Sequence, residues 1–256
     1  MSRIAGKLIL ITGASSGIGA ACARRFASEG ANLVLWARRL ERLEQLAAEL
    51  RPRGVTVRIA RVDVRDRAAV LAAAQALVDD DAVPDVLINN AGLAAGLAPI
   101  QEGDPADWDL MIDTNVKGLL NVTRAILPHM HARGRGHVVN LGSTAGHMTY
   151  PRGNVYAATK FAVRALTEGM NLDALGTPIR VSSVDPGLVE TEFSEVRFHG
   201  DRERAKAAYR GLRPLSADDV ADAVAYVVGT PEHVNVLDLV LMPTAQRNVY
   251  LIDRRE

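Results

Sequence analysis

Tyr156 and Lys160 lie four residues apart in an apolar-periodic stretch, 155–175, that predicts a helix. This spacing stacks both side chains on one helix face. An ammonium held near a phenol favours the phenolate and lowers a pKa that is ordinarily about 10. Such a tyrosine exchanges a proton with an alcohol near neutral pH, and Ser143, at the end of a predicted strand, could donate to the same oxygen. Alone, the pattern also fits a half-buried helix whose tyrosine and lysine only pack.

The bulk composition excludes several classes of protein. Acidic and basic residues balance at 30 each among 256 residues, so no global field attracts nucleic acid or an anionic membrane. No apolar run reaches the roughly 18 residues that cross a bilayer. Because a strand is predicted almost at the start of the sequence, we expect no signal peptide. Cys22 is the only cysteine and is expected to be a core thiol. We expect a cytoplasmic protein with no metal, nucleic-acid or membrane partner.

Short β-rich runs alternate with amphipathic helical patterns. Strands are predicted at 8–12, 32–36, 56–61, 86–89, 137–141, 180–184 and 237–241. Helices are predicted at 17–29, 40–51, 67–79, 106–131, 154–175 and 217–228. Nearly all-apolar strands that are each followed by a helix indicate an α/β fold, with a parallel sheet covered on both faces.

One irregular stretch stands apart from this alternation. Residues 185–215 contain Pro186-Gly187, a helical pattern at 194–210 and Pro214. Ligands bind at the carboxyl ends of strands in open parallel sheets, so this stretch is the expected substrate lid. The whole chain, 1–256, is expected to form one domain that carries this lid.

A glycine-rich turn follows the first predicted strand and opens directly into a helix. Its residues are Thr12, Gly13, Ala14, Ser15, Ser16, Gly17, Ile18 and Gly19. Glycines let backbone N–H groups approach a pyrophosphate, and the helix N-terminus adds its positive end. The spacing, Gly-x-x-x-Gly-x-Gly, differs from the commonest dinucleotide fingerprint, and a tight strand–helix junction could also explain it.

The turn after the second predicted strand carries Arg38 and Arg39, where many NAD sites carry an acid. Two guanidinium groups suit a 2′-phosphate, to which they can donate charge-assisted hydrogen bonds. The sequence therefore predicts NADP(H) as the cofactor, although two solvated arginines at the start of a helix would look the same.

These motifs together resemble the short-chain dehydrogenase/reductase family over nearly the whole chain. The motifs are Thr12–Gly19, Asn89-Asn90-Ala91-Gly92, Asn115, Ser143, Tyr156 with Lys160, and Pro186-Gly187 followed by Thr191. The resemblance implies a Rossmann-type, doubly wound and mostly parallel seven-stranded sheet. It also implies an NADP-dependent oxidoreductase, usually a homotetramer. The predicted helices at 106–131 and 154–175 are partly apolar on their outer faces, which suits such an assembly.

The resemblance also implies a role for each matching residue. Gly13, Ser15, Ser16, Gly17, Ile18 and Gly19 would hold the pyrophosphate, and Asp63 with Val64 the adenine. Asn90, Ala91 and Gly92 would support the sheet and the adenosine ribose. Lys160 would bind the nicotinamide ribose, and the backbone near Asn115 would relay protons through water to Lys160. The residues that would face the nicotinamide are Pro186, Gly187, Val189 and Thr191. Tyr156 would be the acid–base and Ser143 would stabilise the substrate oxygen.

A finer resemblance points to one subgroup, the NADP-dependent 3-hydroxy acid dehydrogenases. It is carried by the residues around these motifs, by 186–194 and 196–201, and by Met242-Pro243-Thr244 with Gln246. The implied substrates are small anionic hydroxy acids or aldehydes, such as serine, allo-threonine or 3-hydroxypropionate.

A small hydroxy acid needs a fixed cation for its carboxylate, because an anion that leaves water must be paired. Arg197 in the predicted lid is the expected partner, with Tyr150 and Gln246 as supporting donors. Alternatively, Arg197 forms a salt bridge within the lid, to Glu192, Glu195 or Asp201. Arg152 departs from the subgroup, which tends to carry a small residue there, and it either reaches the pocket or points to solvent.

Three other functions remain open from the sequence. The protein could reduce another small aldehyde or ketone, such as sulfoacetaldehyde. It could sense nucleotides without chemistry, although such proteins commonly lose the tyrosine or lysine that this chain has. It could also reduce acyl-carrier substrates, for which a basic docking patch would be needed; the candidates are Arg124, Arg133, Arg135 and His137.

Overall fold

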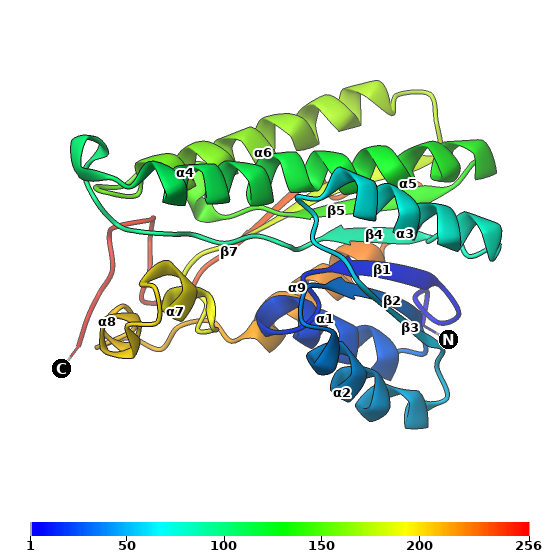
Figure 1. The fold of residues 1–256 in the computed structure, drawn as a ribbon, viewed down its shortest axis with the longest axis horizontal. Coiled ribbons are helices and arrows are strands. Elements are labelled where there is room, and N and C mark those ends of the chain that lie inside the picture. Colours follow the sequence, from blue (N-terminus) through cyan, green and yellow to red (C-terminus); the bar gives the residue numbers. More distant parts are fainter. Residues whose placement is uncertain (1, 256) are drawn as a thin grey trace.

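A parallel sheet of seven strands runs through the centre of the molecule (Figure 1). The computed structural model describes residues 2–255. The strands are β1 (Leu8–Thr12), β2 (Asn32–Ala37), β3 (Val57–Arg61), β4 (Val86–Asn89), β5 (Gly136–Leu141), β6 (Ile179–Pro186) and β7 (Asp238–Leu241). Their order is β3-β2-β1-β4-β5-β6-β7, and every neighbouring pair is parallel. This is the doubly wound Rossmann arrangement expected from the sequence, and the expectation is confirmed.

Helices cover both faces of this sheet (Figure 1). One layer holds α1 (Gly17–Ser28), α2 (Leu40–Leu50) and α9 (Ala217–Val228). The other layer holds α3 (Arg67–Asp79), α4 (Pro105–Ile112), α5 (Leu119–Arg133) and α6 (Asn154–Asp173). Two buried apolar clusters fill the spaces between the sheet and these layers, and Cys22 is fully buried in one of them. The nearly all-apolar strands follow from this double cover.

Short 3₁₀ segments complete the regular structure. They are η1 (Arg51–Arg53), η2 (Ile100–Glu102) and η4 (Thr144–Gly146). Within the described residues, 2–255, no helix is both long enough and apolar enough to cross a membrane.

The helix predicted at 106–131 is interrupted. Between α4 and α5 lies η3 (Asp113–Gly118), a π-helical segment. Periodicity predicts a continuous helix here because the apolar pattern continues through the segment, whereas a π turn adds one residue without a composition signal. The buried side chain of Asn115 lies inside this segment.

The helix predicted at 194–210 is also wrong as one element. The segment predicted to be the lid, 185–215, instead contains α7 (Phe193–Arg197) and α8 (Arg202–Ala207), and we refer to this segment as the lid. His199 and Gly200 between them have φ of 52° and 88°, left-handed values that a continuing α-helix does not accommodate. Asp201 then caps α8 by accepting a hydrogen bond from the backbone of Arg204. Both short helices lie at one end of the sheet, near the C-terminus (Figure 1).

The basic patch considered for acyl-carrier docking does not form. His137 lies buried in β5, and burial lowers its pKa to about 3. Arg133 donates to the carbonyl oxygens of Val83 and Pro84, and Arg135 pairs with Asp85. Among the four candidates, only Arg124 is an exposed cation outside these contacts.

Candidate active site

A cleft of about 560 Å³ opens at the carboxyl ends of the strands. Its walls come from the glycine-rich turn after β1, the turns after β2, β3 and β4, the residues after β5, α6 and the lid. The strand order reverses between β1 and β4, and an open α/β sheet binds its ligands at such a switch point. The fold therefore brings the separate sequence motifs to one site.

The glycine-rich turn fits a dinucleotide because its backbone leaves no room for side chains. Gly13 has φ of +65°, and a Cβ there would lie 2.9 Å from the Cα of Ala91. A Cβ on Gly19 would lie 2.5 Å from the side-chain nitrogen of Asn90. Ser15, Ser16, Gly17 and Ile18 line the cleft at the N-terminus of α1. The N-terminus of α1, whose free N–H groups and dipole favour an anion, thus borders the cleft.

The turn after β4 is fixed to the end of β1 by hydrogen bonds. The hydroxyl of Thr12 accepts from the backbone N–H groups of Asn90 and Ala91, at 3.1 and 3.0 Å. The side chain of Asn90 donates to the carbonyl oxygen of Thr12 at 2.8 Å. Hydrogen bonds therefore join the two turns that border this side of the cleft.

Arg38 and Arg39 both line the cleft, in different states. Across residues 2–255, Arg38 makes no hydrogen bond, and its side chain is exposed. Arg39 donates to the hydroxyls of Ser15 (3.2 Å) and Ser16 (2.7 Å) and pairs with Glu192 of the lid at 3.0 Å. Arg39 is thus held on the glycine-rich turn, whereas Arg38 is free to meet an anion.

Asp63 and Val64 also line the cleft, after β3. Asp63 forms an ion pair with Arg65 at 2.6 Å, and this hydrogen bond holds the pKa of Asp63 below its usual range. Val64 is buried, and its carbonyl oxygen accepts from the side chain of Asn121 at 3.0 Å.

Tyr156 and Lys160 are buried on one face of α6, as their spacing predicts. The Lys160 ammonium nitrogen lies 5.9 Å from the centroid of the Tyr156 ring and donates to the carbonyl oxygen of Leu141 at 2.8 Å. Burial lowers the pKa of Lys160 to about 8, while the charge of Asp185 acts in the opposite direction. The lysine is therefore an anchored, partly desolvated cation beside the phenol.

The prediction of a lowered pKa for Tyr156 is wrong, because the phenol is buried away from water. Burial raises this pKa, and nearby Tyr150 adds to the rise. A hydrogen bond from Ser143 and the charge of Arg197 act in the opposite direction. The cation that opposes the effect of burial therefore belongs to the lid, a relation that helical spacing does not reveal.

Asn115 holds its place through backbone contacts in the π-helical segment. Its side-chain oxygen accepts from the N–H of Leu93, and its side-chain nitrogen donates to the carbonyl of Leu93, both at 2.8 Å. The same nitrogen donates to Thr159 on α6 at 3.0 Å. A Cβ on Gly92 would lie 3.3 Å from the Asn115 oxygen and 3.7 Å from the Lys160 nitrogen. Asn115 thus joins the β4 turn to the helix that carries Lys160.

Ser143 lies beside the phenol of Tyr156, after β5. Its hydroxyl donates to the carbonyl oxygen of Pro186 at 3.4 Å and accepts from the N–H of Ala145 at 3.1 Å. The adjacent Gly142 packs directly against the carboxylate of Asp185, where any Cβ would overlap. The backbone that carries Ser143 is therefore fixed by β6.

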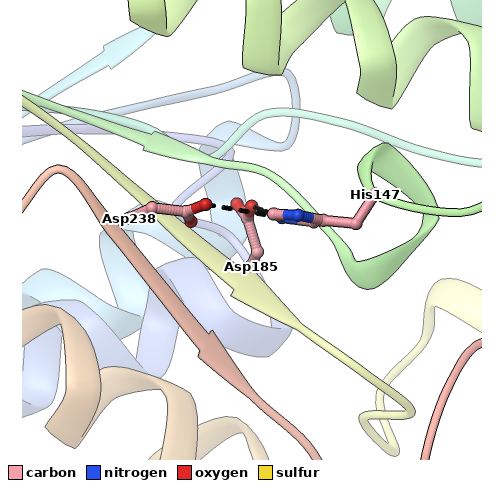
Figure 2. Close-up of side chains that lie close together, drawn as sticks. All are labelled: His147, Asp185 and Asp238. Carbon is pink, nitrogen blue, oxygen red and sulfur yellow. Dashed lines mark hydrogen bonds and ion pairs between the residues drawn. The ribbon is translucent and has the colours of Figure 1, made fainter.

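Figure 2 shows Asp185 between His147 and Asp238. His147 and Ser183 both hydrogen-bond the Asp185 carboxylate, and Asp238 lies 3.7 Å from His147. These three side chains place possible metal-ligand atoms within 4.8 Å of one another, but a hydrogen bond already joins His147 to Asp185. Burial raises the pKa of Asp185. We interpret the cluster as a support for the Ser143 loop.

Asp185 is missing from the residues that the sequence motifs indicate. The sequence carries one signal for it, an acid directly before Pro186-Gly187 in an otherwise buried strand end. Its strand was predicted to end at residue 184, so this carboxylate fell outside the predicted element, whereas β6 continues to Pro186.

Arg197 projects from the lid toward the catalytic candidates. Its guanidinium donates to the Tyr150 hydroxyl at 2.7 Å and lies 5.7 Å from the centroid of the Tyr156 ring. Within residues 2–255 it forms no ion pair, so the alternative of a lid salt bridge does not hold. The ring of Phe193, from the same helix, meets the Tyr156 ring edge to face at 5.6 Å. The lid thus places one cation and one aromatic ring over the phenol.

Pro186, Gly187, Val189 and Thr191 line the cleft between β6 and the lid. Gln246 lines it as well, and its side-chain oxygen accepts from the N–H of Leu188 at 2.9 Å while its nitrogen donates to the carbonyl of Asn248 at 3.0 Å. In this structure Gln246 therefore holds the Pro-Gly turn. Arg152 is exposed, with φ of 66°, and borders a separate cavity of about 170 Å³ that Tyr156 and Arg197 also line.

The chain is similar to known proteins over nearly its whole length. Residues 7–201 match the family model for short chain dehydrogenase. The chain is 48% identical over 249 residues to sulfoacetaldehyde reductase 2 of Chromohalobacter salexigens, covering 96% of this chain and 98% of that protein. It is 46% identical over 240 residues to the NADP-dependent 3-hydroxy acid dehydrogenase of Salmonella typhi, covering 93% and 96%. The closed form of serine dehydrogenase complexed with NADP+ superposes with a TM-score of 0.91 at 44% identity, covering 97% and 100%.

The buried Lys160 makes stability depend on pH in a direction that can be measured. Its pKa of about 8 in the folded protein lies below the value of 10.5 for a free lysine, so between these pH values the unfolded chain binds more protons. The contribution of Lys160 to the free energy of unfolding therefore increases as pH rises. Between pH 7.5 and 9.5, urea denaturation should show the wild-type protein gaining about 1–2 kcal/mol relative to Lys160→Met. Parallel pH dependence in the two proteins would contradict the desolvated lysine.

Proposed function

Because this chain belongs to the short-chain dehydrogenase family, we propose that it is an NADP-dependent oxidoreductase acting on a small 3-hydroxy acid or the corresponding semialdehyde or keto acid. Support comes from a chain-long similarity to an NADP-dependent 3-hydroxy acid dehydrogenase and to a serine dehydrogenase complexed with NADP+. The observation that carries the proposal is the position of Arg197, a lid cation above the ring of Tyr156.

The cofactor assignment rests on residues that fit a dinucleotide with a 2′-phosphate. The glycine-rich turn would hold the pyrophosphate, Asp63 and Val64 would border the adenine, and Arg38 with Arg39 would bind the 2′-phosphate. When bound, the nicotinamide ring supplies the hydride acceptor or donor.

The protein's own residues then handle the proton. In oxidation the Tyr156 oxygen accepts the proton of the substrate hydroxyl, and in reduction it returns that proton to the new alkoxide. Ser143 stabilises charge that develops on the substrate oxygen. Lys160, anchored on the Leu141 carbonyl, binds the nicotinamide ribose, and Asn115 keeps the proton path to Lys160 in place. Arg197 opposes the effect of burial on Tyr156 and so favours its basic form.

Arg197 also gives the substrate its chemical class. A small carboxylate that enters a partly buried cleft must be paired, and a guanidinium presents two parallel donors to it. Tyr150 orients this guanidinium through the hydrogen bond at 2.7 Å. A carboxylate bound here would place a carbon two bonds away near the Tyr156 hydroxyl, as a 3-hydroxy acid requires.

A second candidate function has a specific observation in its favour. A sulfoacetaldehyde reductase is 48% identical to this chain over nearly its whole length. Carboxylate and sulfonate groups both offer anionic oxygens to the paired donors of a guanidinium, so Arg197 suits either. The two functions share the mechanism above and differ only in the anion.

A homotetramer is part of this proposal. Large apolar side chains stay exposed on the outer helical layer at Ile112, Leu120, Phe161, Leu172 and Leu175. Burial between copies of the chain would remove them from water. Light scattering on the purified protein should give four chain masses.

A coupled screen tests the substrate class directly. With NADP+ and serine, allo-threonine or 3-hydroxypropionate, the purified protein should raise the absorbance at 340 nm. With NADPH and malonic semialdehyde or sulfoacetaldehyde, the absorbance should fall. NAD+ should serve poorly, since it lacks the group that Arg38 would bind. Turnover of neutral carbonyl compounds alone would reject an anionic substrate.

Removing the Tyr156 hydroxyl should stop proton transfer. We expect Tyr156→Phe to lower kcat by about 10²- to 10⁴-fold, because the substrate loses its positioned acid–base. NADPH binding, followed by the change in nicotinamide fluorescence, should persist, since the phenyl ring stays in place. Retained turnover in this variant would reject the catalytic assignment.

Truncating Arg197 separates charged from neutral substrates. For Arg197→Ala, KM for the hydroxy acid should rise about 10- to 100-fold, the cost of leaving a carboxylate without its charged partner. A neutral aldehyde should be affected much less. Arg202→Ala is the matched control, because Arg202 lies on the lid with its side chain 77% exposed. Equal losses for both substrate types would remove Arg197 from substrate binding.

A further inference from the structure

The carboxylate of Glu192 connects the lid to the cofactor edge of the cleft. One of its oxygens accepts from Arg39 at 3.0 Å, and the other accepts from Arg42 at 2.5 Å. Glu192 directly precedes α7, whereas both arginines belong to the start of α2. Glu192 and Arg39 line the cleft, whereas Arg42 does not.

Glu192 carries a full negative charge at neutral pH. Partial burial raises its pKa, but hydrogen bonds from Arg42 and Arg39 outweigh that effect and hold the pKa below the usual range. Its side chain is 40% exposed, so the charge also faces the open cleft.

Each of the three nitrogens of the Arg39 guanidinium donates a hydrogen bond while Glu192 is bound to it. Its Nε and one Nη donate to Ser15 and Ser16, and its other Nη donates to Glu192. An anion that arrives at Arg39 therefore meets a guanidinium already paired with a carboxylate. Arg38 is the neighbouring cation without such a partner in residues 2–255.

We propose that Glu192 is a specificity-determining residue, which competes with the 2′-phosphate of NADP(H) for Arg39. The 2′-phosphate must share or displace this ion pair and approach a like charge, and both effects oppose binding. A dinucleotide without the 2′-phosphate leaves the Glu192–Arg39 pair intact. Glu192 thus weakens the preference for NADP(H) that Arg38 and Arg39 provide. This inference rests on the proposed NADP function.

Glu192 belongs to the same segment as the residues at the substrate end of the site. Phe193 and Arg197, which lie against Tyr156, belong to the helix that begins one residue after Glu192. When the carboxylate leaves Arg39, it can stay paired with Arg42, so the exchange does not require the lid to detach.

Binding of cofactor fragments isolates this effect from catalysis. We would measure adenosine 2′,5′-bisphosphate and adenosine 5′-monophosphate by isothermal titration calorimetry, with wild-type protein and Glu192→Gln. The glutamine keeps the size of the side chain and removes its charge. The bisphosphate should bind about 3- to 10-fold more tightly to the variant at low salt, and this gain should shrink at high salt. The monophosphate should change by less than about 2-fold.

Glu195→Gln is the matched control. Glu195 lies on the same short helix, is 47% exposed, and has only a long contact with Arg202 at 3.9 Å. The Glu195→Gln substitution removes the same charge from the lid without touching Arg39. The affinity of this variant for the bisphosphate should therefore match that of the wild-type protein. Thermal melting of both variants should give the cooperative transition of a folded protein.

Several results would overturn the proposal. Weaker or unchanged bisphosphate binding in Glu192→Gln would reject competition, as would an equal gain for the monophosphate. The same gain in Glu195→Gln would attribute the effect to overall lid charge. Equal binding of the two nucleotides by wild-type protein would contradict the NADP assignment. A gain in bisphosphate affinity confined to Glu192→Gln would then still support competition at Arg39. No gain would reject both the NADP assignment and the competition.

Discussion

Burial of the Lys160 ammonium is the constraint on which the rest of the site depends. A desolvated cation is costly unless acceptors surround it, and here the carbonyl of Leu141 accepts its hydrogen bond at the edge of the sheet. That acceptor exists because β5 ends at this residue. The anionic Asp185 lies close enough to stabilise the charge. Strand end, helix face and buried carboxylate must therefore be correct together for the lysine to remain charged.

The same region explains why a small residue stands before Ser143. Asp185 fills the space next to Gly142, so the chain turns there without a side chain. His147 holds the far side of that carboxylate and returns the loop toward β6 (Figure 2). A hydroxyl that must sit at a fixed distance from a substrate oxygen gains from such support on both sides. The charge of Asp185 also stabilises the ammonium of Lys160, whereas it adds to the rise in the pKa of Tyr156.

Much of the fold follows from local sequence, because continuous apolar strands and glycine turns are local signals. The strands at 8–12 and 86–89 have the predicted bounds, and the Tyr156–Lys160 spacing places both side chains together. What sequence could not supply depends on contacts between distant segments. The pairing of Glu192 with Arg39 joins two elements that share no pattern, and the raised pKa of Tyr156 reflects how deeply the lid and helix bury it. The break in the lid depends on two left-handed residues, one of them His199.

The π-helical segment at Asp113–Gly118 changes the rotation of α5 relative to α4. An added residue turns everything after it by about 100° relative to a regular helix, so no single helical wheel describes α4 and α5. The segment is less regular than an α-helix, yet it presents Asn115 inward against Leu93. Shortening the chain by one residue there would restore ideal geometry and rotate that amide off its partners. At this point of the chain, regular α-helical geometry and the contacts of the Asn115 amide therefore exclude each other.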